Sequence, residues 1–274
     1  MNRELDAAKN ATLEAGKILL DFYHADYTVD DKGTSPMYSG SNPVTDADRA
    51  SDDYLKKVLS GEFPEYGWLS EETKDSPNRM LKERVWVVDP LDGTKEYIEK
   101  VPMWVVSVAL VEDHIPIMGI LYNPEKEELF CATKGEGAKL NGEPITCSQE
   151  TDPSTMVILN SRTETRDGLW KPFNNQFREL IGVGSVAYKL GLTAAAKADI
   201  FATLRPKNEW DVCAGHCIVN EAGGSMIDLN GKEVTYNNEN TLFSPGLVAG
   251  NPKAVKKTLA VLTPEITEGV DITI

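Results

Sequence analysis

The chain has little cysteine, few basic residues and no long apolar run, and each shortage excludes a class of protein. Its 274 residues include 4 cysteines, too few for a disulfide framework, so reduced thiols are expected. Its 28 lysines and arginines face 43 aspartates and glutamates, and the net charge of −15 argues against a nucleic-acid groove. The longest nearly continuous apolar stretch, residues 101–111, is about half of the roughly 20 residues that span a bilayer, so no membrane partner is expected.

The remaining composition is that of a folded protein. Apolar residues make up 41% of the chain and charged residues 26%, which is enough for a substantial core. The first residues lack a secretory pattern and lead directly into an amphipathic helix, so we expect a cytoplasmic protein. Cys213, His216 and Cys217 have helical spacing but no second cluster, and we interpret them as a buried helix face rather than a metal site.

Residues 1–150 are predicted to form an α+β domain. Apolar periodicity predicts a helix over 5–22, and Thr45 is typical of the N-cap of a second helix that ends near Leu59. A loop rich in glycine, serine and proline, residues 33–43, separates the two helices. Short apolar runs then predict strands, of which the last three form an antiparallel meander: 66–70, 85–88, 105–111, 117–123 and 129–133.

Residues 151–274 are predicted to form an α/β domain, because strand and helix signals alternate after Gly142 and place a boundary near Glu150. The expected strands are 157–160, 200–203, 226–228 and 248–249. The expected helices are 169–180, 185–197, 211–222 and 252–262. No flexible linker separates the halves, so we expect them to share an extensive interface.

The strongest local signal is a buried strand that leads into a turn with two carboxylates, in the sequence Val87-Val88-Asp89-Pro90-Leu91-Asp92-Gly93-Thr94. Pro90 keeps Asp89 extended, and the turn can bring both carboxylates and the Leu91 carbonyl toward one point, a set of oxygens that suits Mg²⁺. The short helix that follows offers free N–H groups to a phosphate. The same residue types also make ordinary turns, so the motif alone leaves a plain loop open.

Three further acidic segments point to the same chemistry, and each has a plain alternative. Glu71 and Glu72 follow an apolar strand 18 residues before Asp89, whereas adjacent acids usually form a solvated pair. Asp211 follows a tryptophan at the start of an apolar helix, and Asp48 lies in the first turn of another. Capping and the helix dipole favour acids at both places, whatever the function.

Together the four segments resemble the inositol monophosphatase-like family of Mg²⁺-dependent, lithium-sensitive phosphatases. The family pattern is Glu-Glu, then Asp-Pro-(Ile/Leu)-Asp-Gly-Thr, then a distant Trp-Asp and a helix ending in Glu-Ala-Gly-Gly, and all of these occur here in order, ending at Gly224. The resemblance covers nearly the whole chain. It implies an α/β protein with a layered αβαβα sandwich of the inositol monophosphatase and fructose-1,6-bisphosphatase type. Many members dimerise, so a homodimer stays open, although the sequence shows no exposed apolar face.

The resemblance also implies roles for individual residues. Two or three Mg²⁺ ions per site would be held by Glu71, Asp89, the Leu91 carbonyl, Asp92 and Asp211. The residues assigned to catalysis are Asp48, Glu71, Glu72 and Thr94, with Asp48 and Thr94 helping to activate the attacking water. The residues assigned to the substrate are Asp92, Gly93, Thr94, Arg162, Gly184, Ser185, Lys189 and Asp211. A dense carboxylate cluster needs cations, which also make water a better nucleophile.

The residues assigned to substrate binding also have purely structural explanations. Ser185 would simply cap a helix, and Lys189 or Lys95 would be a solvated surface lysine. Arg162 could form a bidentate phosphate contact, as could Arg205 and Lys207 in the segment before Trp210.

The substrate is predicted from the residues after Asp92. The run Asp92-Gly93-Thr94-Lys95-Glu96-Tyr97 looks like the 3′(2′),5′-bisphosphate nucleotidases, whereas simple inositol monophosphatases typically read Asp-Gly-Thr-Thr-Asn-Phe. The resemblance implies that a metal-activated water hydrolyses the 3′-phosphate of adenosine 3′,5′-bisphosphate to AMP and phosphate. Residues 204–209 lack the acid that inositol-specific members use to hold sugar hydroxyls, unless Glu209 serves.

Two other functions stay open. The first is an inositol-1-phosphate or fructose-1,6-bisphosphate phosphatase, which would use the same metal site on another phosphorylated small molecule. The second is a non-catalytic sensor of a metal or phosphometabolite, which is disfavoured because Asp48 and Thr94 are both present beside the expected ligands.

Overall fold

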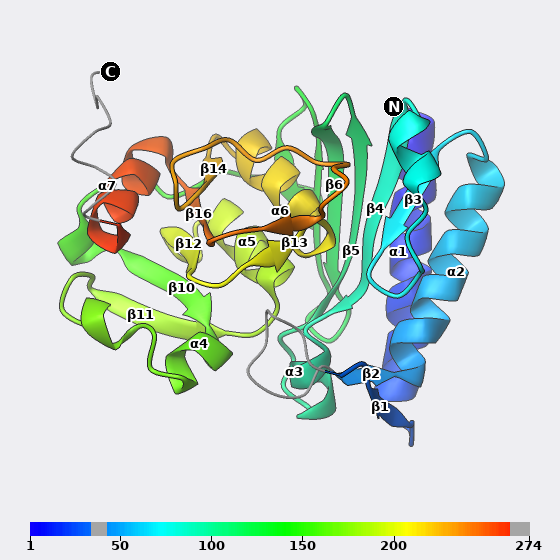
Figure 1. Cartoon of the computed structure of the whole chain (residues 1–274), viewed down its shortest axis with the longest axis horizontal. Coiled ribbons are helices and arrows are strands. Elements are labelled where there is room, and N and C mark those ends of the chain that lie inside the picture. The colour runs from blue at the N-terminus through cyan, green and yellow to red at the C-terminus, as the bar shows by residue number, and fades with distance from the viewer. Residues whose placement is uncertain (34–42, 264–274) are drawn as a thin grey trace.

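The computed structural model describes residues 1–33 and 43–263, so most of the predicted loop 33–43 lies outside the described residues. The elements stack in five layers that alternate between helices and sheets, with α1 and α2 at one side and α7 at the other (Figure 1). This arrangement confirms the predicted αβαβα sandwich. Among the described helices, none combines the length and the apolar character needed to cross a membrane.

The first layer is the helix pair α1 (Asn2–Tyr23) and α2 (Asp46–Glu62). On α1 the residues that face the large sheet are mostly small and recur at helical spacing, namely Ala8, Ala11, Ala15 and Leu19. On α2 the side chain of Thr45 accepts hydrogen bonds from the amides of Ala47 and Asp48, and the carboxylate of Asp48 accepts one from the amide of Thr45. This capping box confirms the predicted N-cap and fixes Asp48 in the first turn.

The second layer is a sheet of seven strands in chain order: β3 (Gly67–Ser70), β4 (Arg84–Asp92), β5 (Val105–Glu112), β6 (Ile115–Asn123), β7 (Glu128–Thr133), β8 (Ala138–Leu140) and β9 (Glu143–Ile145). Only β3 and β4 pair in parallel, and the rest of the sheet is antiparallel, so the predicted meander is confirmed. The parallel pairing brings the carboxyl ends of β3 and β4 to the same edge.

The third layer consists of α5 (Val186–Ala194) and α6 (Glu209–Glu221), which lie between the two sheets. Gly119 on β6 allows α6 to approach closely, because a Cβ there would lie 2.3 Å from the carbonyl oxygen of Ala214. This contact sets the position of the helix that carries Asp211.

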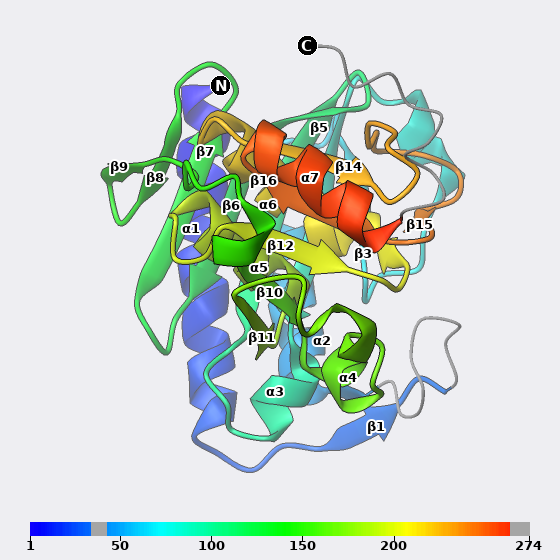
Figure 2. The same ribbon diagram turned by 90° about the vertical axis from the view of Figure 1, so that its left-hand side faces the viewer.

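The fourth layer is a five-stranded sheet in the order β11 (Glu179–Val183), β10 (Val157–Ser161), β12 (Ile200–Thr203), β16 (Leu247–Gly250) and β14 (Ser225–Asp228). Strands β11, β10 and β12 are parallel, and β16 is antiparallel to both of its neighbours. Helix α7 (Pro252–Leu262) packs on this sheet as the fifth layer, on the side away from α6, and α4 (Arg162–Arg166) follows β10 (Figure 2).

Smaller elements complete the described chain. They are α3 (Thr94–Ile98), the strand pairs β1 (Val29–Asp31) with β2 (Pro43–Thr45) and β13 (Lys207–Asn208) with β15 (Leu242–Phe243), and three short 3₁₀ turns at Pro77–Leu81, Pro153–Thr155 and Lys171–Phe173. The sequence patterns did not predict β1, β8, β9, β11, β13 or β15.

One predicted helix, 169–180, is wrong. The segment instead holds a 3₁₀ turn and the start of β11, and the helix lies earlier as α4. Gly168 has a φ of 82°, which ends helical structure, and Pro172 has no amide proton to continue it. Trp170 and Phe177 are buried in the core under α7, so their spacing reports burial and not a helix.

Candidate active site

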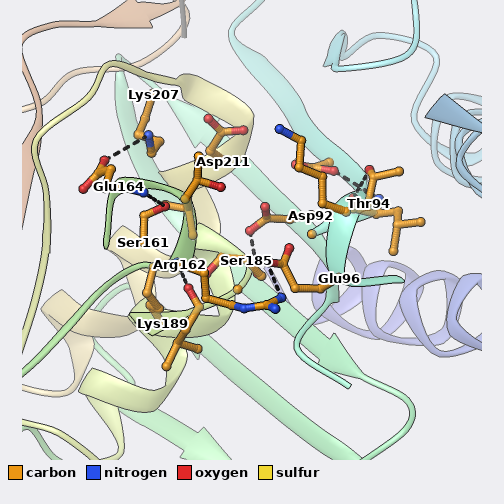
Figure 3. Close-up of a pocket in the computed structure, with 18 of the residues that line it drawn as sticks. Asp92, Thr94, Glu96, Ser161, Arg162, Glu164, Ser185, Lys189, Lys207 and Asp211 are labelled. Atoms are coloured by element: carbon orange, nitrogen blue, oxygen red, sulfur yellow. Dashed lines mark hydrogen bonds and ion pairs between the residues drawn. The ribbon is translucent and has the colours of Figure 1, made fainter. Parts of the chain in front are cut away.

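One pocket collects residues from both halves of the chain. It is lined by the end of β4, by α3, by the β10–α4 and β11–α5 junctions, by residues 205 and 207, and by the first turn of α6. In the view of Figure 3, Lys207 and Glu164 lie at one side of the pocket and Thr94 at the other, with Asp92 and Asp211 between them.

Four acidic residues that line this pocket form what we call the carboxylate wall: Glu71, Asp89, Asp92 and Asp211. Glu71 directly follows β3, Asp89 and Asp92 lie near the end of β4, and Asp211 lies in the first turn of α6. The large sheet, at its β3–β4 edge, therefore supplies three of the four, and the helix between the sheets supplies the fourth.

Each aspartate of the carboxylate wall is held by hydrogen bonds. Asp89 accepts from the Leu91 amide at 3.0 Å, and Asp211 accepts from the Asn208 amide at 2.8 Å. Asp92 accepts from Ser185 Oγ and from the Ala187 amide, both at 2.6 Å. These bonds use some of the lone pairs of the wall and orient the carboxylates rigidly.

The wall carries uncompensated negative charge. Burial and the charges of Glu71, Asp92 and Asp211 raise the pKa of Asp89 well above its usual range. Burial and the charges of Asp92 and Glu71 do the same to the pKa of Asp211. Burial raises the pKa of Asp92 to about 6, even though its hydrogen bonds to Ser185 and Ala187 and the charge of Lys189 act against this rise. Crowded carboxylates of this kind require a cation or protons.

Asp48 and Thr94 form a pair beside the wall. Thr94 Oγ1 lies 3.0 Å from Asp48 Oδ1 and 3.2 Å from the Leu91 carbonyl oxygen. Burial is the main cause that raises the pKa of Asp48 to about 6, and the charge of Glu71 adds to it. Gly93, which has a φ of 104°, allows the chain to turn from β4 into α3 and brings Thr94 to this position.

Lys32 is the cation that lies against the Glu71–Glu72 pair. Its ammonium is 3.0 Å from Glu71 Oε1 and also forms an ion pair with Glu72. Burial alone would lower the pKa of Lys32, but the two carboxylates raise it above its usual range. Burial and the charge of Glu71 raise the pKa of Glu72 to about 7. The sequence analysis missed this contact, because 39 residues separate Lys32 from Glu71.

One face of α2 supports the segments that carry the wall. Ser51 Oγ donates to the Pro90 carbonyl at 3.0 Å. Asp52 is buried and accepts from Ser70 Oγ and, at 2.6 Å, from Thr73 Oγ1, so it closes the turn that holds Glu71. Together with Asp48, these residues couple the helix to both acidic segments.

The donor set fits Mg²⁺. It consists of oxygens alone, from the four carboxylates of the wall and the Leu91 carbonyl beside Thr94, and hard oxygen ligands are those that Mg²⁺ prefers. Within residues 1–33 and 43–263, no group of three or more aspartate, glutamate, histidine or cysteine side chains is placed to hold a metal ion as it stands. The fit therefore rests on the chemistry of the donors and on the excess negative charge.

Basic residues also line the pocket, and we call four of them the cation wall: Arg162, Lys189, Arg205 and Lys207. Arg162 forms ion pairs with Glu96 and Glu99, both at 3.0 Å. Lys189 is 2% exposed and donates to the carbonyls of Val183 and Ser185, at 2.9 and 2.6 Å, so the interpretation of a solvated surface lysine is wrong. Burial lowers its pKa to about 8.

Glu164 organises the chain behind the cation wall, and no sequence signal identified it. Its buried carboxylate accepts from Trp170 Nε1 at 2.9 Å, from Thr203 Oγ1 at 2.6 Å and from two backbone amides of the following loop. Lys207 Nζ lies 4.0 Å from it. Glu164 thereby fixes the loop that presents Arg205 and Lys207.

The Gly184–Ser185 turn caps a helix, as one of the two interpretations of the sequence expected, and it also lines the pocket. Ser185 accepts a hydrogen bond from the Tyr188 amide and caps α5, and it also donates to Asp92 in the pocket. A Cβ at Gly184 would lie 2.3 Å from Glu96 Cγ, so the position needs glycine. Glu209, by contrast, lies away from the pocket and accepts from the amides of Asn237 and Asn238.

Most of the residues assigned from sequence line the pocket: Glu71, Asp89, Leu91, Asp92, Gly93, Thr94, Arg162, Gly184, Ser185, Lys189 and Asp211. Asp48 and Glu72 lie behind the lining and reach it through Thr94 and through Lys32 with Glu71. Lys95, left between a phosphate contact and a solvated lysine, also lines the pocket, as do Glu96 from the same run and Ser161 beside Arg162. Glu164, which lines the pocket too, was not predicted.

Comparison with known proteins gives one consistent result. The model of the inositol monophosphatase family matches residues 1–268. Inositol monophosphatase 3 of Solanum lycopersicum is 32% identical over 239 residues, covering 84% of this chain and 87% of that protein. The Nus factor SuhB of Escherichia coli K12 is 29% identical over 280 residues, covering 98% of this chain and 99% of that protein.

Solved structures agree with this result. The IMPase of Thermotoga maritima superposes with a TM-score of 0.82 at 26% identity, covering 98% of this chain and 99% of that one. The extragenic suppressor protein suhB of Bartonella henselae gives a TM-score of 0.80 at 26% identity, covering 97% of this chain and 98% of that one.

Proposed function

Because the chain belongs to the inositol monophosphatase family, a family of metal-dependent phosphatases, we propose that it hydrolyses the 3′-phosphate of adenosine 3′,5′-bisphosphate to AMP and phosphate. The observation that carries this choice is that the cation wall and the carboxylate wall line the same pocket. A substrate with two phosphates can place one beside each wall, whereas a monophosphate of a neutral sugar would use only the carboxylate side.

Members of this family generally use Mg²⁺, and the carboxylate wall with the Leu91 carbonyl would hold two or three ions here. When bound, these ions supply Lewis acidity and neutralise the charge of the phosphate. The protein contributes the rigid orientation of the ligands, through the hydrogen bonds to Asp89, Asp92 and Asp211.

Asp48 and Thr94 supply the proton acceptor. The water that attacks phosphorus gives a proton to Thr94 Oγ1 while Thr94 passes its own proton to Asp48 Oδ1, 3.0 Å away. A pKa of about 6 keeps Asp48 ionised near neutral pH and still able to accept a proton. The bond between phosphorus and the 3′-oxygen breaks, that oxygen takes up a proton from a solvent water and leaves as a hydroxyl, and Asp48 returns its proton to solvent.

The Gly184–Ser185 turn orients the substrate in this proposal. Ser185 is fixed by its bonds to Asp92 and Tyr188, and Gly184 leaves room for the side chain of Glu96, which also lines the pocket. Gly93 and Thr94 begin α3, whose free amides face the phosphate. The partner is thus a phosphorylated small molecule.

Phosphate release measured side by side tests the proposal. We expect kcat/KM with Mg²⁺ to be about 100-fold higher for adenosine 3′,5′-bisphosphate than for inositol-1-phosphate or fructose-1,6-bisphosphate, roughly 2.7 kcal/mol of transition-state binding. The family also leads us to propose inhibition by Li⁺, which the same assay measures. If the chain releases phosphate from none of these three compounds, the result favours a non-catalytic sensor.

The second candidate is an inositol-1-phosphate phosphatase. It is favoured by the curated relatives named inositol monophosphatase, such as that of Solanum lycopersicum at 32% identity. Against it, the segment 204–209 offers no acid to the pocket, because Glu209 binds the amides of residues 237 and 238. A higher kcat/KM for inositol-1-phosphate would establish this candidate and leave the metal site unchanged.

A further inference from the structure

Arg79 is a buried cation outside the pocket. Its side chain is 1% exposed and lies in the 3₁₀ turn Pro77–Leu81, in the segment that follows Glu71. Its guanidinium donates to both carboxylate oxygens of Asp75, at 2.8 and 3.0 Å. It also donates to Asn237 Oδ1 and to the Asn238 carbonyl oxygen, both at 2.7 Å. Arg79 therefore joins the segment after Glu71 to a loop that lies 158 residues further along the chain.

That loop, residues 235–241, is bound both to the large sheet and to α6. Figure 1 shows the chain crossing α6 on its way from β14 to β15. The amide of Tyr236 donates to the carbonyl of His114 in the β5–β6 turn at 3.0 Å, and its carbonyl oxygen lies 2.6 Å from His114 Nδ1. The hydroxyl of Tyr236 lies 2.9 Å from Nδ1 of His216 on α6. The loop is thus a fixed connection rather than a free surface segment.

Glu209 binds the same loop at the start of α6. Its buried carboxylate accepts from the Asn237 amide at 2.7 Å, from the Asn238 amide at 2.9 Å and from Asn238 Nδ2 at 3.0 Å. Its own amide donates to the Thr241 carbonyl at 2.8 Å. Asp211 follows Glu209 in the same helical turn. Asn237 and Asn238 therefore connect the guanidinium of Arg79 to the turn that carries Asp211.

The carboxylate wall needs such a connection because its members come from both halves of the chain. Asp89 and Asp92 share β4, so local structure fixes their spacing. Glu71 and Asp211 belong to different halves but line one pocket, and like charges in one pocket repel each other. Contacts that hold their two segments together oppose this repulsion and keep the ligands near the arrangement that a metal ion requires.

From these contacts we infer that Arg79 is a positioning residue for the metal site. Through Asn237, Asn238 and Glu209, it holds the segment that carries Glu71 against the first turn of α6. The inference rests on the metal site of the proposed function. Arg79 lies outside the pocket lining, so it acts through the placement of Glu71 and Asp211 and not on the substrate. A guanidinium suits this role, because its planar group binds partners on two sides in a fixed geometry.

Mg²⁺ binding in the absence of substrate tests the inference. Arg79→Lys keeps the charge beside Asp75 but cannot reproduce the planar set of hydrogen bonds, so we expect the Kd for Mg²⁺, measured by titration calorimetry, to rise about 10-fold. Arg84→Lys is the matched control, because Arg84 forms ion pairs with Glu4 and Glu112, both in the first half of the chain.

The control separates a change in the metal site from a general loss of stability. Both substitutions should lower the thermal unfolding midpoint, but Arg84→Lys should leave the Kd for Mg²⁺ within about 2-fold of that of the wild type. A folded Arg79→Lys protein with an unchanged Kd overturns the inference, as does an equal rise in both variants.

A double-mutant cycle with Asn237→Gly tests the connection itself. This substitution removes an acceptor of Arg79, keeps the amide that Glu209 binds and tolerates the φ of 60° at this position. If Arg79 acts through Asn237, each single substitution raises the Kd about 10-fold, and the double substitution raises it far less than the roughly 100-fold of two independent effects. Fully multiplied effects overturn the inference. Should Arg79→Lys fail to fold, an unchanged Kd in Asn237→Gly overturns it instead.

Phosphate release from adenosine 3′,5′-bisphosphate, measured on the same proteins, distinguishes this inference from the proposed function. If the affinity for Mg²⁺ depends on Arg79 and Asn237 in a chain that releases no phosphate, the positioning role is supported and the proposed reaction alone is rejected. If the wild-type chain binds no Mg²⁺, the inference and the metal site are both overturned.

Discussion

The two walls of the pocket manage their charges in opposite ways. In the carboxylate wall, burial and the repulsion among neighbouring acids raise the pKa of Asp89 and Asp211 far above the usual range. In the cation wall, Arg162 is neutralised by two glutamates and Lys189 is bound by two backbone carbonyls. The carboxylate wall is therefore incomplete without added cations, whereas Arg162 and Lys189 in the cation wall already have partners within the protein.

The walls also differ in the elements that carry them. The carboxylates lie at the ends of β3 and β4 and in the first turn of α6, and α2 braces two of these segments. The cations lie in α4, in α5 and in the loop fixed by Glu164. A metal site needs rigid geometry, which strand ends provide, while shorter elements can vary and set the choice of substrate.

Asp92→Asn is expected to have the largest effect, because it removes one charge from the carboxylate wall. Both hydrogen bonds, from Ser185 Oγ and from the Ala187 amide, end on Asp92 Oδ2, and the amide oxygen of asparagine can accept both in its place, so the fold should persist. The charge of a metal ligand is lost, and we expect kcat/KM with Mg²⁺ to fall about 1000-fold, roughly 4 kcal/mol. Phosphate release measures the loss and the thermal unfolding midpoint confirms the fold. Activity close to wild type would remove Asp92 from the metal site.

Removing Mg²⁺ tests the carboxylate wall in the absence of substrate, through the stability of the fold. Saturating Mg²⁺, at about 100 times its Kd, should stabilise the fold by about 2.7 kcal/mol and raise the unfolding midpoint by roughly 5 °C. Asp89→Asn relieves repulsion, so it should raise the midpoint of the metal-free protein and reduce the gain from Mg²⁺. Differential scanning calorimetry in chelator and in Mg²⁺ measures both. The exposed Asp53→Asn serves as the control, and an equal gain from Mg²⁺ in all three proteins contradicts the assignment.

Asp52→Asn tests whether α2 positions the carboxylate wall. Asp52 touches no part of the pocket lining, but it accepts from Ser70 and Thr73 on either side of the Glu71–Glu72 pair. An amide can accept only one of these two bonds with its oxygen. We expect the concentration of Mg²⁺ that gives half-maximal activity to rise about 10- to 100-fold, as for other residues that orient metal ligands. If kcat falls while the Mg²⁺ dependence is unchanged, Asp52 has a different role.

The sequence predicted the carboxylate wall better than the cation wall, for a physical reason. Strand ends and helix starts leave local signals, so Asp89, Asp92 and Asp211 could be assigned from apolar runs, turn residues and a family resemblance. The contacts of the cation wall depend on distant pairs such as Arg162 with Glu96, which lie 66 residues apart. Glu164 and Lys32 left no pattern at all, because their partners are fixed by tertiary structure.

The wrong prediction of a helix over 169–180 also arises from tertiary structure. Leu169, Trp170, Phe173 and Phe177 have helical spacing because they pack into the core under α7, while Gly168 and Pro172 prevent a helix there. The error hid β11, and with it the position of the Val183 carbonyl that Lys189 binds.

Lys189→Met has the smallest expected effect. It tests whether Lys189 supports the pocket or contacts the substrate. Lys189→Met leaves the carbonyls of Val183 and Ser185 without their donor, which loosens the turn that presents Ser185 to Asp92. Because this turn serves every substrate, we expect kcat/KM to fall by a similar factor, about 10-fold, for adenosine 3′,5′-bisphosphate and adenosine 3′-monophosphate. Lys189→Arg, which keeps the charge, should not restore activity, because a guanidinium does not fit a pocket that leaves Lys189 2% exposed. A selective loss on the bisphosphate for Lys189→Met would contradict this expectation and place the ammonium of Lys189 in contact with the second phosphate.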